Sequence, residues 1–296
     1  MTSVGAPWHL VPELPEAETI AAGLRRPLTG RSVRSVKVIR SDLLDETPGR
    51  FSESLTGRKI EGVSRRGKNV VLEVGGKTCP VMDSAVLVVN LGMSGKLLHR
   101  PKGAQSPLPS HPGLCLRMDD GSSVIYDDVR RFGRLRMMSR AEYRAWSHTL
   151  GPEPLSHSFT LKGLVRELAR SSTPIRGWLL DQRRVAGVGN IYANEALFHA
   201  RVHPQRPANR LTTTDARRLH RAIRSILRAA VAASGTTLRD YRTAEGGRGS
   251  YAGHLRVYGK EGARCAQCDN EIRRITFGGR SAFFCPICQP TTGIST

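Results

Sequence analysis

The chain has 296 residues, of which 39% are hydrophobic, enough for two or three packed domains, so global disorder is excluded. No apolar run reaches about 18 residues, which excludes a transmembrane helix, and the first eleven residues lack the pattern of a signal peptide. A cytoplasmic protein is therefore expected. The net charge of +21, with 38 arginines and eight lysines, predicts a polyanionic partner. Nucleic acid is favoured over a membrane, because no basic amphipathic helix has an aromatic face.

The first half of the chain predicts one short helix followed by strands. It opens with V-P-E-L-P-E at 11–16, and the acidic, Ala-rich run that follows predicts a helix over roughly 16–26. From about Val33 to Met138, short β-rich runs such as V-V-L-E-V (70–74) are separated by glycines. This pattern predicts a β-sandwich or barrel-like domain.

The second half predicts helices and then a loop. Helical patterns dominate from 160 to 234, and the clearest helix begins at a Thr cap in 212–214 and ends before Gly235. Residues 235–257 are rich in Gly and Arg and predict a mobile loop.

Two C-x-x-C pairs close the chain, with sixteen residues between them. This spacing is typical of a four-cysteine zinc ribbon, in which the intervening run forms a β-hairpin. Two redox-active pairs are the alternative, but nothing nearby resembles a thioredoxin βαβ unit. One zinc ion with four protein ligands has no open position, so its role would be structural. The hairpin arginines, among them Arg280, would be natural phosphate contacts. The predicted zinc ligands are Cys265, Cys268, Cys285 and Cys288.

Three further motifs suit nucleic-acid contact, and each also has an ordinary structural explanation. V-A-G-V-G-N-I-Y (185–192) predicts a turn before a helix starting near Asn190, where backbone N–H groups can bind an anion, although a simple helical corner fits too. D-D-V-R-R-F-G (127–133) suits phosphate contact and insertion between bases, or a solvated strand end. N-L-G-M-S-G-K-L (90–97) holds Met93 in a turn, although methionine is more often a core residue.

Taken in order, these motifs resemble those of the bacterial formamidopyrimidine-DNA glycosylases, which share a superfamily with endonuclease VIII. The resemblance covers about residues 12–290. It rests on P-E-L-P-E (12–16), R-R-G-K-N (65–69), L-G-M-S-G (91–95), R-R-F-G (130–133), L-G-P-E-P-L (150–155), V-G-N-I-Y (188–192), H-P (203–204) and G-R-S-A-F-F-C-P-I-C-Q (279–289).

The resemblance implies an α+β multidomain fold. A catalytic N-terminal β-sandwich with flanking helices would span 12–145, and a helix–two-turns–helix DNA-binding domain 146–240. A loop that covers the lesion and the β-hairpin zinc ribbon would span 241–290. The run 236–251 resembles that covering loop.

The resemblance also implies a repair enzyme acting on double-stranded DNA. The family excises oxidised purines, such as 8-oxoguanine and formamidopyrimidines, and then nicks the abasic strand by β,δ-elimination. Pro12 is implied as the amine that attacks C1′ and forms an iminium, and Glu13 as the acid that protonates the sugar ring oxygen. Glu16 would belong to the same pocket, and Lys68 would contact phosphate and assist after base release. Arg280 would support catalysis by gripping the phosphates that flank the lesion.

Other residues are implied to hold the DNA. Met93, Arg130 and Phe132 would fill the gap left by the flipped nucleotide, since the lost stacking must be replaced. Together with P-E-L-P-E in place of P-E-G-P-E, they favour the formamidopyrimidine branch. The residues implied to bind DNA are Glu16, Met93, His111, Arg130, Arg131, Phe132 and Asn190. A monomer is expected.

The chain departs from the family at several positions. Asn90 stands where the family usually has His, Val129 where it has Pro, and Arg176 where it has Lys. Arg keeps the charge but changes the donor geometry. These departures bear on base preference and affinity more than on the type of reaction.

The position of Pro12 is the most consequential departure. Its nitrogen is joined to Val11 as a delocalised amide without an N–H, which cannot form an iminium. Val11 stands where the family has its initiator Met, and the arginine-rich composition suits a GC-rich gene with GTG starts. We therefore expect residues 1–11 to be an extension from a mis-assigned start. The alternatives are a damage-binding homologue without covalent catalysis and a glycosylase in which Glu13 activates water.

Overall fold

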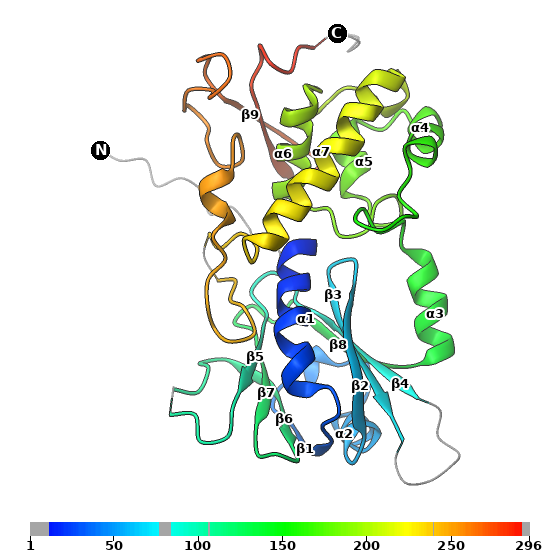
Figure 1. Ribbon diagram of the computed structural model, residues 1–296, viewed down its shortest axis with the longest axis vertical. Helices are drawn as coiled ribbons and strands as arrows, with labels where there is room; N and C mark the ends of the chain where they lie inside the picture. Colours follow the sequence, from blue (N-terminus) through cyan, green and yellow to red (C-terminus); the bar gives the residue numbers. More distant parts are fainter. Residues whose placement is uncertain (1–11, 77–83, 106, 239, 292–296) are drawn as a thin grey trace.

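The computed structural model describes residues 12–76, 84–105, 107–238 and 240–291. The predicted extension 1–11 lies outside them. Two four-stranded sheets occupy one end of the molecule, and a group of helices with a two-stranded hairpin occupies the other (Figure 1). The predicted α+β fold is confirmed, while the domain limits themselves stay a prediction.

The N-terminal sheets form a sandwich around a single core. The first sheet has the order β1 (Val33–Val38), β6 (Pro112–Met118), β7 (Ser123–Asp127), β5 (Lys96–Arg100). The second has the order β2 (Lys59–Arg66), β3 (Asn69–Gly75), β4 (Ala85–Asn90), β8 (Arg134–Ser139). Side chains of both sheets, such as Leu72 and Leu116, belong to one buried cluster. Each such buried side chain stabilises the fold by about 1.5–3 kcal/mol. The predicted β-sandwich is confirmed.

Helix α1 (Leu14–Leu28) runs from the helical part onto the sandwich (Figure 1). It begins earlier than the sequence predicted, because Pro15 lies in its first turn, where a missing N–H costs nothing. Ile20 and Leu24 are buried in the sandwich core, whereas Leu14 is buried among the helices. Pro12 and Glu13, directly before α1, therefore lie where the two parts meet. The short helices η1 (Ser41–Leu43) and α2 (Pro48–Leu55) complete the sandwich.

The helical part follows α3 (Arg140–Thr149), which lies along the second sheet (Figure 1). Its helices are α4 (Leu161–Ala169), α5 (Ile175–Leu180), α6 (Asn190–Ala200), η2 (Ala208–Arg210) and α7 (Thr213–Ala232). Helix α7 starts as predicted, because the hydroxyl of Thr212 accepts the N–H of Asp215 at 3.1 Å. Across the described residues, no helix is long and apolar enough to cross a membrane.

The chain ends in η3 (Tyr251–His254) and the hairpin β9 (Arg273–Phe277) and β10 (Arg280–Phe284). The expectation of a mobile loop at 235–257 does not hold for several of its aromatic and aliphatic residues, although Leu238 is exposed. Tyr241 is buried in the sandwich core, and Tyr251 and Val257 are buried among the helices. These apolar side chains, spaced between the glycines, anchor the segment to both parts of the molecule.

Candidate active site

Glu13 is the buried centre of the site. It is only 2% exposed, and its carboxylate accepts the N–H groups of Gly189 at 2.7 Å and Ile191 at 2.8 Å. Both amides belong to the start of α6, where unpaired N–H groups and the helix dipole favour an anion. The Gly-rich turn predicted to hold an anion therefore holds a carboxylate of the protein itself.

Lys68 approaches Glu13 across the same turn. A Cβ added to Gly189 would collide with the Glu13 carboxyl and would lie 2.6 Å from Lys68 Nζ, so any larger residue would displace these groups. Lys68 lies in the turn between β2 and β3, and Glu13 caps α1. The fold thus brings a sandwich residue, an N-terminal residue and the helical part together at one point.

Burial shifts the pKa values of both ionisable groups toward neutrality. Desolvation raises the pKa of Glu13 to about 7, against the positive charge of Lys68, which lowers it. Desolvation lowers the pKa of Lys68, and the charge of Arg280 acts in the same direction, whereas Glu13 opposes both. A buried acid with a raised pKa beside an amine with a lowered pKa suits proton transfer.

Glu16 ties three segments together one turn further along α1. Its carboxylate accepts the N–H of Glu13 at 2.8 Å, the hydroxyl of Tyr192 at 2.6 Å and the N–H of Thr236 at 2.7 Å. Burial raises its pKa, and these hydrogen bonds lower it. Glu16 therefore couples the segment at 236–251 to Glu13, which fits a positioning role.

Pro12 is buried and opens onto a small cleft beside Glu16. Met93 lines the same cleft from the sandwich, and Leu238 and Tyr241 line it from the 236–251 segment. The structure therefore groups the predicted nucleophile, the pocket glutamate and a predicted gap-filling residue. The predicted covering segment closes the cleft on one side.

The three predicted gap-filling residues lie on two adjoining turns. Arg130 Nη1 lies 4.0 Å from Met93 Sδ, and Phe132 is 60% exposed. Gly92, next to Met93, has a φ of +57°, and a Cβ there would lie 2.5 Å from the backbone nitrogen of Gly133. This close backbone contact sets Met93, Arg130 and Phe132 at the same edge of the sandwich.

A second cluster suits a phosphate. Arg176 Nη2 donates to Asn190 Oδ1 at 2.7 Å and to the carbonyl of Ser281 at 2.8 Å, which joins α6 to the hairpin. Burial and the neighbouring charge of Arg280 lower the pKa of Arg176 to about 10. Within the described chain Arg176 forms no ion pair with a carboxylate. An anion placed between Asn190 and Arg280 would relieve this uncompensated charge.

Two predicted DNA-binding residues stand apart from these clusters. His111 is exposed before β6, and its backbone N–H donates to Asp127 Oδ1 at 2.6 Å. Arg131 has a left-handed backbone with φ of +57° and forms an exposed ion pair with Asp42 at 3.4 Å. Among the described contacts, neither residue bonds to the Glu13 or Arg176 clusters, so their roles stay predictions.

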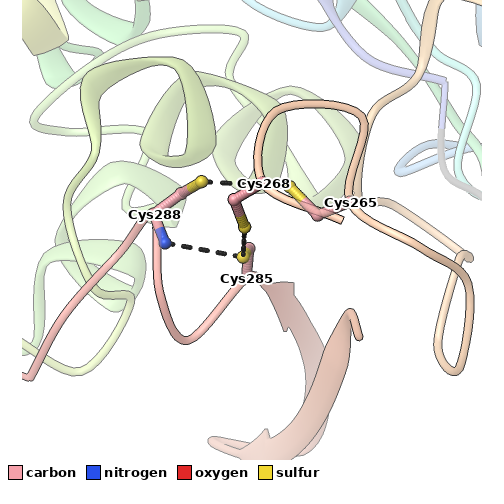
Figure 2. Close-up of side chains that lie close together, drawn as sticks. All are labelled: Cys265, Cys268, Cys285 and Cys288. Carbon is pink, nitrogen blue, oxygen red and sulfur yellow. Dashed lines mark hydrogen bonds between the residues drawn. The ribbon is translucent and has the colours of Figure 1, made fainter. Parts of the chain in front are cut away.

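The four C-terminal cysteines converge on one point (Figure 2). All four sulfurs lie within 4.8 Å of one another; Cys265 and Cys288 are 3.9 Å apart, and Cys268 and Cys285 are 3.4 Å apart. Zn–S bonds of about 2.3 Å in a tetrahedron place sulfurs about 3.8 Å apart. The donor set therefore fits one zinc ion with no open position.

Three family sequence models match consecutive parts of the chain. They describe a formamidopyrimidine-DNA glycosylase N-terminal domain (residues 11–135), its H2TH domain (150–242) and a zinc finger found in FPG and IleRS (262–291). The formamidopyrimidine-DNA glycosylase of Chloroflexus aggregans is 41% identical over 282 residues, covering 94% of this chain and 98% of that protein. That of Heliobacterium modesticaldum is 40% identical over 283 residues, covering 94% and 100%. The chain belongs to the formamidopyrimidine-DNA glycosylase family.

Solved structures agree with this membership. A Lactococcus lactis FPG mutant in complex with Fapy-dG containing DNA superposes with a TM-score of 0.86 at 33% identity, covering 95% of this chain and 100% of that one. The L. lactis enzyme in complex with abasic-site DNA gives 0.85 at 33%, covering 94% and 100%. The predicted family and the single structural zinc are confirmed, and the enzyme class, a bifunctional glycosylase and abasic-site lyase, is that of the family.

Sequence reasoning missed two residues of this family member that shape the site. Buried Asp128 accepts the hydroxyl of Ser94 at 2.6 Å and the N–H of Gly133 at 2.9 Å, so it braces the two gap-filling turns. Tyr192 holds Glu16 through its hydroxyl. Both lie inside motifs that sequence reasoning singled out, but a carboxylate beside arginines and an aromatic within a helix do not reveal distant partners.

Proposed function

We propose that this chain excises oxidised purines from double-stranded DNA and then cuts the abasic strand, with Glu13, Lys68 and Pro12 at the reacting sugar. The observation that carries the proposal is the meeting of Glu13 and Lys68 at Gly189, beside the cleft lined by Pro12. An acid with a pKa of about 7 can give up its proton at neutral pH. Membership of the formamidopyrimidine-DNA glycosylase family supports the same reaction.

The reaction couples base release to ring opening. The Pro12 amine attacks C1′ while the glycosidic bond breaks, and the base leaves with the bonding electrons and takes up a proton from water. Glu13 gives its proton to the ring oxygen as the C1′–O4′ bond breaks, and the amine loses its own proton to leave an iminium. Loss of a C2′ proton then expels the 3′ phosphate, and a second elimination expels the 5′ phosphate. Water hydrolyses the iminium and restores Pro12.

Binding of the damaged strand prepares this reaction. Arg280 and Asn190 contact the phosphates beside the lesion, where Arg176 leaves positive charge uncompensated. Met93, Arg130 and Phe132 fill the space of the extruded nucleotide, which must leave the stack before its C1′ can be reached. The segment at 236–251 covers the extruded base.

The covalent route requires that the working enzyme begin at Pro12, because an amide nitrogen is not a nucleophile. The match to the family's N-terminal domain begins at residue 11, which supports this start. N-terminal sequencing with an intact mass of the protein from its native cells tests it. A chain starting at Met1 or Thr2 contradicts it.

Borohydride trapping on a duplex with 8-oxoguanine separates the three candidate functions. A chain starting at Pro12 should give a covalent protein–DNA adduct, and the full 296-residue chain should give none. Base release without an adduct from the shorter chain would instead support water activation by Glu13. Binding of the lesion without base release would support a damage-binding homologue.

The remaining predictions concern assembly and location. We propose a monomer that works on DNA in the bacterial cytoplasm, associated with the nucleoid through its positive charge. Sedimentation of the complex with one lesion duplex should give one protein per site. Two proteins per site would contradict the monomer.

A further inference from the structure

The outer face of the second sheet changes from polar to apolar side chains along its strands. Strand register places Asn69 opposite Asn90 and Asn90 opposite Arg134, which gives a polar row at the end nearest Lys68. The following row includes Val88 and Arg136. Further along, Val71, Val86 and Val88 form an apolar patch with Met138 of β8, and α3 covers this patch through Tyr143 and Trp146.

A cavity of about 320 Å³ opens where α3 stops covering the sheet. Its wall includes Lys68, Asn90, Arg134, Arg136 and Trp146. Three of these side chains are cationic and no carboxylate lines the cavity, so its field favours an anion. The volume lies at the small end of the range of about 300–1,000 Å³ for ligand sites.

The two asparagines of the polar row are held by hydrogen bonds to neighbouring residues, whereas within the described part of the chain the charge of Arg134 is not balanced by a carboxylate. Asn90 Nδ2 donates to Asn69 Oδ1 at 2.8 Å, and Asn90 Oδ1 accepts the N–H of Gly92 at 2.9 Å. Arg134 Nη1 donates to the carbonyl of Gly133 at 2.8 Å, and in the described residues its guanidinium has no carboxylate partner. Arg136, in contrast, is paired with Asp45. A guanidinium has five N–H donors, so Arg134 keeps donors for a ligand.

We propose that this cavity binds a phosphodiester of the DNA strand held at the active site, with Arg134 as the charged donor and Trp146 as a flat wall for the adjoining sugar or base. The inference rests on the proposed function. The inference adds to the proposed function a second contact site for the DNA backbone, next to the phosphate that Lys68 is proposed to contact. Lys68 lines both sites, so a strand bound in the cavity continues directly into the active site.

Arg134→Gln tests the site, with Arg117→Gln as its matched control. Arg117 is an exposed strand arginine in β6 of the other sheet, so its substitution removes the same charge elsewhere. Dissociation constants for a non-cleavable lesion duplex are measured over a series of salt concentrations. Arg134→Gln should weaken binding and reduce the salt slope by about 1, the effect of one lost phosphate contact. Arg117→Gln should change neither, and equal slopes for the two variants overturn the inference.

Shortening the duplex stepwise from each end identifies the ligand as DNA backbone. The wild-type chain should lose affinity at the step that removes the bound phosphodiester, and Arg134→Gln should not respond at that step. A variant that responds like the wild type overturns the inference, as does inorganic phosphate that binds the cavity while shortening has no effect. If the wild type fails to bind or cut the lesion duplex at all, the proposed function fails instead.

Discussion

The carboxyl group of Glu13 and the ammonium group of Lys68 both lie against the backbone of Gly189. Each modifies the other's pKa, since the positive charge of Lys68 lowers that of Glu13 and the negative charge of Glu13 raises that of Lys68. The pair places a proton donor and a cation within one buried turn. Substitution at the turn and a change of pH should both reveal this arrangement.

Gly189→Ala should abolish base excision, because its methyl group overlaps the Glu13 carboxyl and approaches Lys68 Nζ. Overpacking of this kind also costs about 1–3 kcal/mol of folding free energy. Single-turnover excision and chemical denaturation measure the two effects. Gly253→Ala is the control, since a Cβ there meets nothing within 4 Å. Equal excision rates for the two variants would contradict the role of the turn.

Base excision should decline as the pH rises through about 7, because Glu13 then loses the proton that it donates. The free energy of unfolding also depends on pH through Glu13. Its pKa in the folded state exceeds the unfolded value of 4.5, so between these two pKa values the folded state binds more protons than the unfolded state. The resulting stability is fully present below pH 4.5 and is lost as the pH rises to about 7. Glu13→Gln should remove both dependences, in excision rates and in denaturation midpoints across pH. A wild-type rate that stays constant from pH 6 to 8 would count against Glu13 as the acid.

Much of the site could be predicted from the sequence, because its motifs are local. The zinc ligands follow from cysteine spacing alone, and the helix that starts at Asn190 follows from the glycines before it. The roles of Glu13 and Lys68 came from the family resemblance. No local pattern indicates that these two residues meet at Gly189, because Gly189 lies more than a hundred positions along the chain from each of them.

The parts that sequence could not predict depend on packing between distant segments. The segment at 235–257 reads as a mobile loop because of its glycines, yet Tyr241 and Tyr251 are buried against different parts of the fold. Arg176 is noticeable in sequence only as a replacement for lysine. Its link between Asn190 and the hairpin depends on the docking of β10 beside α6, which no single-segment pattern encodes.

Arg280→Ala should weaken DNA binding and strand cutting while leaving the fold intact. Arg280 is exposed at the start of β10, so its loss leaves no cavity and no buried partner. Removing one phosphate contact should also reduce the salt slope by about 1. Binding and cleavage of a lesion duplex at moderate salt, with Arg117→Ala as control, give the comparison. Unchanged strand cleavage would refute the phosphate contact.

Arg176→Lys should lower both stability and DNA affinity, although the charge is retained. Its guanidinium reaches Asn190 and Ser281 with one nitrogen and stacks 4.8 Å from the Phe277 ring, a geometry that an ammonium group cannot reproduce. Loss of these hydrogen bonds should cost about 1–3 kcal/mol. Thermal denaturation and duplex binding are compared with Arg166→Lys, an exposed substitution on α4. If both variants behave like the wild type, Arg176 does not position the hairpin.

Removal of the zinc should abolish DNA binding, because the hairpin that carries Arg280 depends on the four thiolates for its position. The hairpin has only two short strands, β9 and β10, and two strands alone are marginally stable in water. Chelation should therefore release about one zinc per chain and lose binding, and added zinc should restore both. The sandwich has its own core and should keep its β-structure in circular dichroism throughout. Full duplex binding by the zinc-free protein would show that the hairpin holds its position without the metal.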